Sequence, residues 1–189
     1  SFVIMLALWE GAKASIMKEF SGSSNIISIV TKYNSESQAR SIFTEEISSL
    51  IGEKVPNISH TFFKIEASGW ETLYQDKNIG HTVTGIPQWY LEYKNVWLIY
   101  GNYFSPQQYD EKSKVALLWF KLIRDTFWEE NPLGKSITIN GEQFLVQGIL
   151  QEKNWEFDYA IFLPHTSVKN SLNISRIDSI EVSVQDEKD

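Results

Sequence analysis

The segment that most constrains the fold is a predicted β-hairpin within residues 131–150. Apolar and polar residues alternate over residues 136–139, as a half-buried strand requires. Asn140 and Gly141 follow, and this dipeptide favours a type I′ turn because both central residues need φ > 0. We therefore expect a second strand to return antiparallel to the first. Its predicted faces are Phe144, Val146 and Gly148 on one side and Leu145 and Ile149 on the other.

The same segment contains Gly134, Lys135 and Ser136, a sequence found in phosphate-binding loops. That motif also needs a glycine five positions before Gly134, where this chain has Glu129. It further needs a helix after the lysine, whose N-terminus would hold the phosphate, whereas a strand is predicted here. We interpret Lys135 as an ordinary solvated side chain.

Composition excludes several classes of protein. A chain of 189 residues holds one domain or two small ones with a sufficient core. A formal net charge of -7 argues against a nucleic-acid interface. The absence of cysteine excludes disulfides, a thiolate metal site and a cysteine nucleophile.

The first 20 residues change character along their length. Residues 2–9 are apolar on every side, which is unusual for a surface helix. From Glu10 onward only one helical face is apolar. A helix leaving a bilayer shows this change, with Trp9 at the interfacial belt. A buried core helix and the remnant of a signal peptide are the alternatives.

A strand-helix-strand unit is predicted next. Its strands span residues 25–33 and 58–67. Ser35 or Ser37 is the predicted helix cap, and Gly52 and Pro56 are expected to end the helix. The helix carries one apolar stripe that faces a core. The stripe consists of Ala39, Ile42, Phe43, Ile47, Leu50 and Ile51.

Short strands and turns are predicted from residue 69 onward. Thr84 is expected to point outward from a strand, and Ser105 to cap a helix with Pro106 at its first position. Trp119 is assigned to a helix and to the core, whereas Trp89 lies in loop-like surroundings, where core packing and a partner surface both stay open. The strands are predicted at residues 79–86, 96–100, 114–118, 159–163 and 180–184, with a helical stripe over 119–127.

This layout predicts an α+β fold with two lobes. Residues 21–67 and 176–189 form a lobe from both chain ends, which contains the strand-helix-strand unit. Residues 68–175 form an inserted, mostly β lobe, and residues 1–20 precede both lobes.

Several motifs occur in an order that resembles a known family, the MacB-type periplasmic core domain of ABC transporter permeases (MacB/FtsX-like). They are Glu10-Gly11-Ala12-Lys13, Thr84-Gly85-Ile86-Pro87, Leu98 to Ser105, Val115 to Leu118, Asn131 to Lys135, Ile139-Asn140-Gly141 and Ile161 to Pro164. One departure is Asn102, where the family more usually has arginine. A salt bridge made by that arginine is therefore not carried over.

The resemblance implies a non-catalytic extracytoplasmic (periplasmic) part of a bacterial inner-membrane protein, placed between two transmembrane helices. It implies efflux transport by mechanotransmission, with ATP hydrolysed by a separate cytoplasmic domain or subunit. The two lobes would be the family's Porter and Sabre subdomains, and residues 1–20 the end of a transmembrane helix and its stalk. A homodimer, a periplasmic adaptor and a directly bound substrate are all compatible with it. The alternative function is a periplasmic binding module for a lipid or hydrophobic peptide.

The residues show no constellation for catalysis, a metal or a cofactor. His60, His81 and His165 lack helical metal-ligand spacing. Trp155 and Phe157 lie among charged residues, and we predict that they contact a partner, since aromatic residues are enriched at interfaces.

Overall fold

A computed structural model of the chain describes residues 26–30, 43–67, 69–79, 82–127, 131–153, 159–174 and 176–184. The chain divides into two compact units. Unit 1 comprises Ser1–Phe63 and Asp178–Asp189, and unit 2 comprises Lys64–Ile177. The first and last parts of the chain thus share one unit, and unit 2 is inserted between them. The boundary at Phe63 falls inside strand β2 (Ile58–Ala67).

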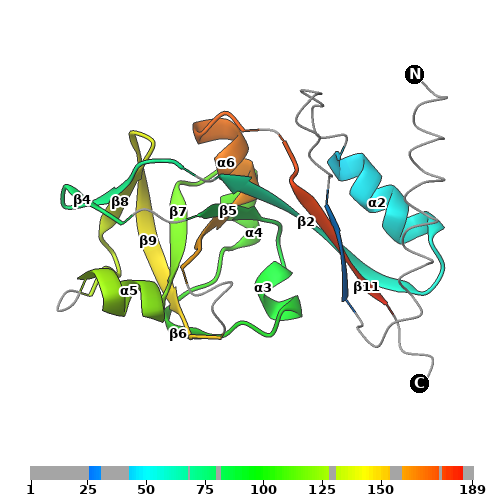
Figure 1. Cartoon of the computed structure of the whole chain (residues 1–189), viewed down its shortest axis with the longest axis horizontal. Coiled ribbons are helices and arrows are strands. Elements are labelled where there is room, and N and C mark those ends of the chain that lie inside the picture. Colours follow the sequence, from blue (N-terminus) through cyan, green and yellow to red (C-terminus); the bar gives the residue numbers. More distant parts are fainter. Residues whose placement is uncertain are drawn as a thin grey trace. The chain divides into compact units, whose positions relative to one another are not determined.

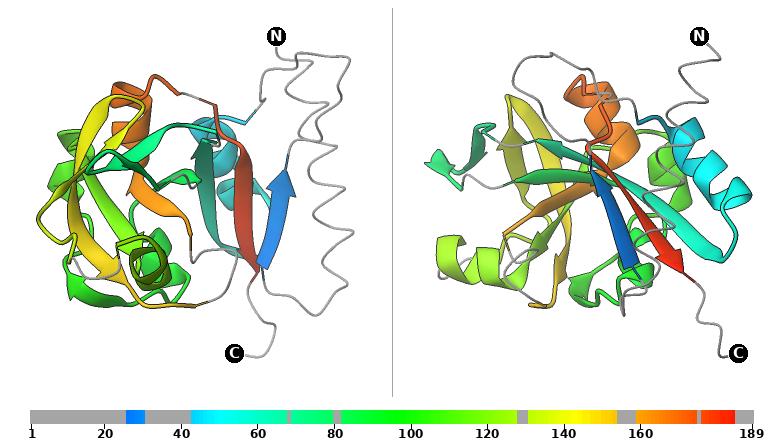
Figure 2. Two further views of the ribbon diagram at one scale, coloured as in Figure 1. Left: turned by 60° about the vertical axis from the view of Figure 1, so that its left-hand side comes forward. Right: turned by 45° about the vertical axis from the view of Figure 1, so that its right-hand side comes forward.

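Unit 1 is a small sheet with one described helix. Strand β11 (Ser179–Val184) lies between β1 (Ile26–Val30) and β2, and it is antiparallel to β1. The left view of Figure 2 shows these strands side by side, with helix α2 (Glu45–Lys54) behind them. The strand-helix-strand unit is therefore present, but the last strand of the chain is inserted between its two strands.

Helix α2 begins at another cap than predicted, and it ends at Lys54, two residues before Pro56. Thr44 is the N-cap, since its side chain accepts a hydrogen bond from the Ile47 amide at 3.2 Å. The prediction of a cap at Ser35 or Ser37 is therefore wrong for this helix. It also continues through Gly52 to Lys54, because a single glycine weakens a helix without ending it.

Unit 2 is built on a mixed, twisted sheet (Figure 1). From the second half of β2 its order is β5-β10-β7-β9-β8-β3-β4, and β6 also pairs with β9. The β5–β10 and β7–β9 pairs are parallel. The strands are β3 (Thr72–Tyr74), β4 (Lys77–Asn78), β5 (Val83–Ile86), β6 (Leu98–Gly101), β7 (Val115–Trp119), β8 (Ser136–Ile139), β9 (Glu142–Leu150) and β10 (Ile161–Pro164).

Four helices of unit 2 are described. They are α3 (Tyr90–Tyr93), α4 (Pro106–Asp110), α5 (Phe120–Phe127) and α6 (His165–Ser171). Helix α6 packs on β5 and β10, and α4 lies against α6. The approach of α6 to β5 is close because Gly85 has no side chain, and a Cβ there would lie 3.0 Å from Val168.

The hairpin prediction is confirmed. Asn140 and Gly141 join β8 to β9 with φ of 49° and 83°, as a type I′ turn requires. Phe144 and Val146 are buried, whereas Leu145 is 45% exposed. The predicted faces of β9 are therefore correct over residues 144–146. Ile149, predicted on the face of Leu145, is only 3% exposed, and the register with β7 shifts after Val146.

Two predictions in unit 2 are wrong, and one helix was missed. Thr84 is buried, because β5 lies between β2 and β10 and is covered by α6. Trp119 is the last residue of strand β7 and not part of a helix, although its predicted place in the core is confirmed. Strand β10 ends at Pro164, and helix α6, which begins at the next residue, was not predicted.

The predicted class, a two-lobed α+β fold with a mostly β inserted lobe, is confirmed by this architecture.

Candidate functional site beside helices α3 and α4

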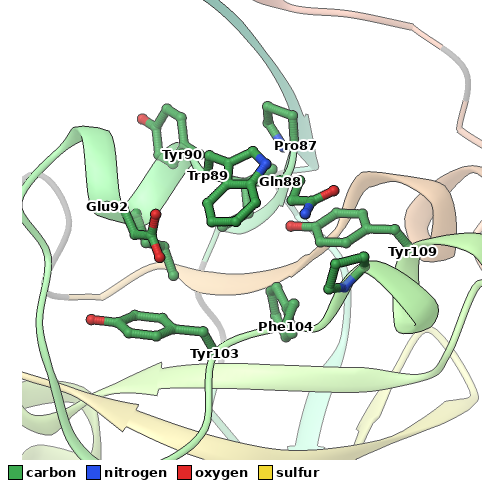
Figure 3. A pocket seen from close by; sticks show the side chains of 11 residues that line it. Pro87, Gln88, Trp89, Tyr90, Glu92, Tyr103, Phe104 and Tyr109 are labelled. Atoms are coloured by element: carbon green, nitrogen blue, oxygen red, sulfur yellow. The ribbon is translucent and has the colours of Figure 1, made fainter.

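An aromatic hollow opens in unit 2 beside helices α3 and α4 (Figure 3). Its volume is about 60 Å³. The residues that shape it come from the turn after β5, from α3, from the segment after β6 and from α4. Those used below are Pro87, Trp89, Glu92, Tyr103, Phe104 and Tyr109.

The turn after β5 places Trp89 at the edge of the hollow. Pro87 ends the strand because it has no amide hydrogen to donate. Trp89 follows with φ of 69°, and its carbonyl accepts the Tyr93 amide at 3.0 Å. A left-handed conformation is unfavourable for a bulky side chain and is enriched at functional sites. The Trp89 side chain is nevertheless 61% exposed, so burial of its ring does not compensate for the strain.

A cluster of buried aromatic side chains packs helix α3 against the core of unit 2. Tyr90 is 1% exposed and contacts Phe162 edge-to-face, with ring centroids 6.3 Å apart. Phe162 in turn contacts Trp119 at 5.7 Å. Such pairs add stability beyond the area they bury. The short helix α3 is therefore anchored to the core through the residue next to Trp89.

Tyr103 fixes the segment between α3 and β6. Its hydroxyl donates to the Val96 carbonyl at 2.8 Å and accepts the Leu98 amide at 3.2 Å. Its own carbonyl accepts the side-chain amide of Gln147 at 2.7 Å. The hydroxyl and the backbone of Tyr103 are thus both held in place, and its ring forms one wall of the hollow.

Gly101 allows this wall to approach β9. Its φ is 84°, and a Cβ there would lie 2.1 Å from the Gln147 carbonyl oxygen. No other residue type fits that contact without moving the backbone of β9.

The opposite wall belongs to α4. Ser105 and Gln108 form a capping box at its start, as the Ser105-Pro106 sequence predicted. The Tyr109 ring lies 6.1 Å from Phe104 and 5.6 Å from His165, and the Tyr109 carbonyl accepts the Thr166 hydroxyl at 2.8 Å. Helix α6 therefore fixes the position of Tyr109.

Two polar groups face the hollow without a protein partner among the described residues. The Glu92 side chain is exposed and makes no hydrogen bond or ion pair with them. Tyr109 is only 8% exposed, and burial raises the pKa of its phenol above the ordinary value. Its hydroxyl has no hydrogen-bond partner in the described parts of the chain, and Figure 3 shows it directed into the hollow. A carboxylate, an aromatic face and an unused hydroxyl together suit a cationic group.

The sequence singled out only part of this arrangement. Trp89 was noted as a loop residue, and Tyr103 lies within a motif of the family resemblance. Glu92 and Tyr109 were missed, because neither occupies a recognisable motif. The predicted partner-contact residues Trp155 and Phe157 lie outside the described residues, as does His81.

The other two histidines have aromatic neighbours. His60 stacks on Phe62 with ring centroids 6.1 Å apart, and His165 lies beside Tyr109. Across the described ranges, no three His, Asp or Glu side chains form a group that could hold a metal ion. No helix within those ranges is both long and apolar enough to cross a membrane.

The sequence of the chain is similar to parts of known transporter proteins. The chain is 30% identical over 197 residues to the macrolide export ATP-binding/permease protein MacB of Chlorobaculum tepidum, covering 97% of this chain and 30% of that protein. It is 28% identical over 176 residues to the pyoverdine export ATP-binding/permease protein PvdT of Pseudomonas syringae, covering 88% and 26%. The chain thus spans less than a third of these relatives.

Solved structures share the fold. The periplasmic region of MacB from Actinobacillus actinomycetemcomitans superposes with a TM-score of 0.72 at 21% identity, covering 90% of this chain and 79% of that one. The extracellular domain of the noncanonic ABC-type transporter YknZ from Gram-positive bacteria gives 0.71 at 20% identity, covering 86% and 85%. The model of the MacB-like periplasmic core domain matches residues 1–189. This chain therefore belongs to the family of MacB-like periplasmic core domains.

Proposed function

We propose that this chain is the non-catalytic extracytoplasmic domain of an ABC transporter permease, and that it couples ATP hydrolysis in the cytoplasm to movement outside the membrane or docks a partner there. ATP hydrolysis belongs to another domain or subunit of the same transporter. Unit 1 corresponds to the Porter-like lobe and unit 2 to the Sabre-like lobe, with residues 1–20 as the end of a transmembrane helix and its stalk.

The pairing of the first and last described strands supports the coupling role. In the antiparallel register of β1 and β11, Ile26 is opposite Ser183 and Val30 is opposite Ser179. The start of one strand therefore lies beside the end of the other. The chain enters β1 and leaves β11 at the same end of one sheet. This arrangement suits a domain inserted between two neighbouring membrane helices.

The size of the hollow argues against a lipid or hydrophobic peptide bound in the hollow itself, the alternative function considered above. Pockets for ligands of drug size occupy roughly 300–1,000 Å³. The hollow beside α3 and α4 measures about 60 Å³, which is too small for an acyl chain. Partner docking is compatible with the proposal, and Trp155 and Phe157 stay the residues we propose for contact.

The coupling role can be tested by loosening the connections to unit 1 in the intact transporter. Four residues, Gly-Ser-Gly-Ser, are inserted before Ile26 or after Val184, which adds a flexible span of roughly 10 Å. We expect ATP hydrolysis to persist while transport falls severalfold, because displacement of the flanking segments no longer reaches the sheet. The measurement compares transport and ATP hydrolysis in the same membranes.

The matched control places the same insert between Asn140 and Gly141, at an exposed hairpin tip that tolerates insertion. This variant is expected to transport normally. Normal transport by both junction variants would show that the domain does not couple the two processes.

A further inference from the structure

We propose that the hollow beside α3 and α4 is a receptor for the guanidinium group of an arginine side chain on a protein partner. The inference deepens the docking part of the proposed function and rests on it. It names the chemistry that the docked partner presents.

The first argument is charge complementarity. The Glu92 carboxylate lines the hollow and makes no ion pair with any residue in the described ranges. Figure 3 shows it on the same side of the hollow as Tyr103, with Trp89 nearby. A cation that enters here meets one carboxylate and the faces of electron-rich rings, which both attract positive charge.

The second argument is the Tyr109 hydroxyl. The residue is 8% exposed, and its hydroxyl is directed into the hollow without a partner among the described residues. Because the hydroxyl faces the open hollow and makes no hydrogen bond with the described residues, its oxygen is available to a ligand. A guanidinium has several N–H donors in one plane, so one of them can donate to the Tyr109 hydroxyl while the positive charge is attracted to the Glu92 carboxylate.

The third argument is the conformation of Trp89. Its left-handed backbone, with φ of 69°, holds a 61% exposed indole at the rim. An exposed indole face pairs with a planar guanidinium better than with a compact ammonium group, because the guanidinium can stack on it. The hollow therefore favours arginine over lysine.

The size of the hollow indicates that the ligand is a side chain of a larger molecule. A volume of about 60 Å³ accommodates a head group but little more. The rest of the ligand must lie on the surrounding surface, where Trp97 is 63% exposed. Trp97 lies between Val96 and Leu98, the two residues whose backbone groups bind the Tyr103 hydroxyl. A peptide can place its arginine in the hollow and its backbone along this surface.

The test uses the whole 189-residue chain labelled with ¹⁵N and two synthetic peptides, acetyl-Gly-Ser-Arg-Ser-Gly-amide and the same peptide with citrulline. Citrulline matches arginine in shape but is neutral. The readout is the indole N–H signal of Trp89, identified by its loss in Trp89→Phe. We expect the arginine peptide to shift this signal saturably with a Kd on the order of 1 mM, and citrulline to bind about tenfold more weakly.

Variants separate the contributing groups. Glu92→Gln is expected to weaken arginine binding about tenfold, and Tyr109→Phe about threefold, since it removes one hydrogen bond. The control is Asp110→Asn, which removes an equal charge from an exposed residue outside the hollow. It should leave binding unchanged. Folding of each variant is checked from the remaining amide signals.

Equal binding of the arginine and citrulline peptides would overturn the proposal, as would equal losses in Glu92→Gln and Asp110→Asn. A Trp89 signal that does not move at 10 mM peptide, on the order of ten times the expected Kd, would overturn it too. None of these results bears on coupling, which is measured separately by the insertions in the intact transporter.

Discussion

Replacing Gly101 by alanine should destabilise unit 2 by more than the cost of placing alanine at a positive φ. The added Cβ would lie 2.1 Å from the Gln147 carbonyl oxygen and 2.7 Å from the Gly148 Cα. Both are backbone atoms of β9, so no side-chain rotation relieves the contact. The Gln147 carbonyl also accepts the Asn102 amide at 3.3 Å, so moving it disturbs the pairing of β6 with β9.

Gly141 provides a matched reference. Its φ is 83°, against 84° for Gly101, but a Cβ at Gly141 would meet nothing within 4 Å. Alanine in a left-handed conformation costs roughly 1–2 kcal/mol, and this cost applies to both variants. The restriction of the unfolded chain is also the same in both. The difference between the two variants therefore isolates the contact with β9.

Forcing atoms into a packed region costs typically 1–3 kcal/mol, so we expect Gly101→Ala to lose about 2 kcal/mol more than Gly141→Ala. With a urea m-value of about 2 kcal/mol/M, the unfolding midpoint of Gly101→Ala should lie about 1 M below that of Gly141→Ala. The assay is urea unfolding of the chain, followed by tryptophan fluorescence and circular dichroism. Equal midpoints for the two variants would refute this account of Gly101.

Two further predictions concern other parts of unit 2. The Tyr159 hydroxyl donates to the Asp125 carboxylate at 2.7 Å and, with Arg124, lowers the pKa of Asp125. The stability that this interaction contributes is present above the unfolded-state pKa of Asp125 and is lost as pH falls through the folded-state pKa. Tyr159→Phe should therefore raise the pKa of Asp125, measured as the midpoint of its titration by ¹³C NMR. An unchanged midpoint would contradict this role of Tyr159. In the intact transporter, replacing Trp155 and Phe157 by alanine should reduce partner binding and stimulated ATP hydrolysis. Phe120→Ala, at an exposed aromatic residue outside the proposed contact, should leave both unchanged. Wild-type values of both measurements in the Trp155 and Phe157 variant would remove these two residues from the proposed contact.

Local sequence determined the features that could be predicted. The turn at Asn140-Gly141 and the cap at Ser105-Pro106 depend on residues within a few positions of one another, and both are present. The return strand after the turn was assigned correctly for the same reason. Its alternating pattern reflects one buried and one exposed face over residues 144–146.

Features that depend on distant segments could not be predicted. Thr84 is buried because β2, β10 and α6 surround β5. The residues next to Thr84 in the sequence do not indicate which elements will pack on this strand. Trp119 reads equally well as the end of a strand or the start of a helix, since α5 begins at the next residue. The hollow could not be predicted for the same reason. Glu92 and Tyr109 line it together only because the turn after β5 and helix α4 are both fixed to the core.

The pairing of β1 with β11 has a mechanical consequence. Because Ile26 and Ser183 lie at the same end of the ladder, a force that separates the two flanking segments loads one backbone hydrogen bond at a time. Such a ladder opens like a zipper under little tension. A force that moves both segments together loads no single bond and displaces the sheet as a unit. The geometry thus resists a force that moves both flanking segments together and yields to one that parts them.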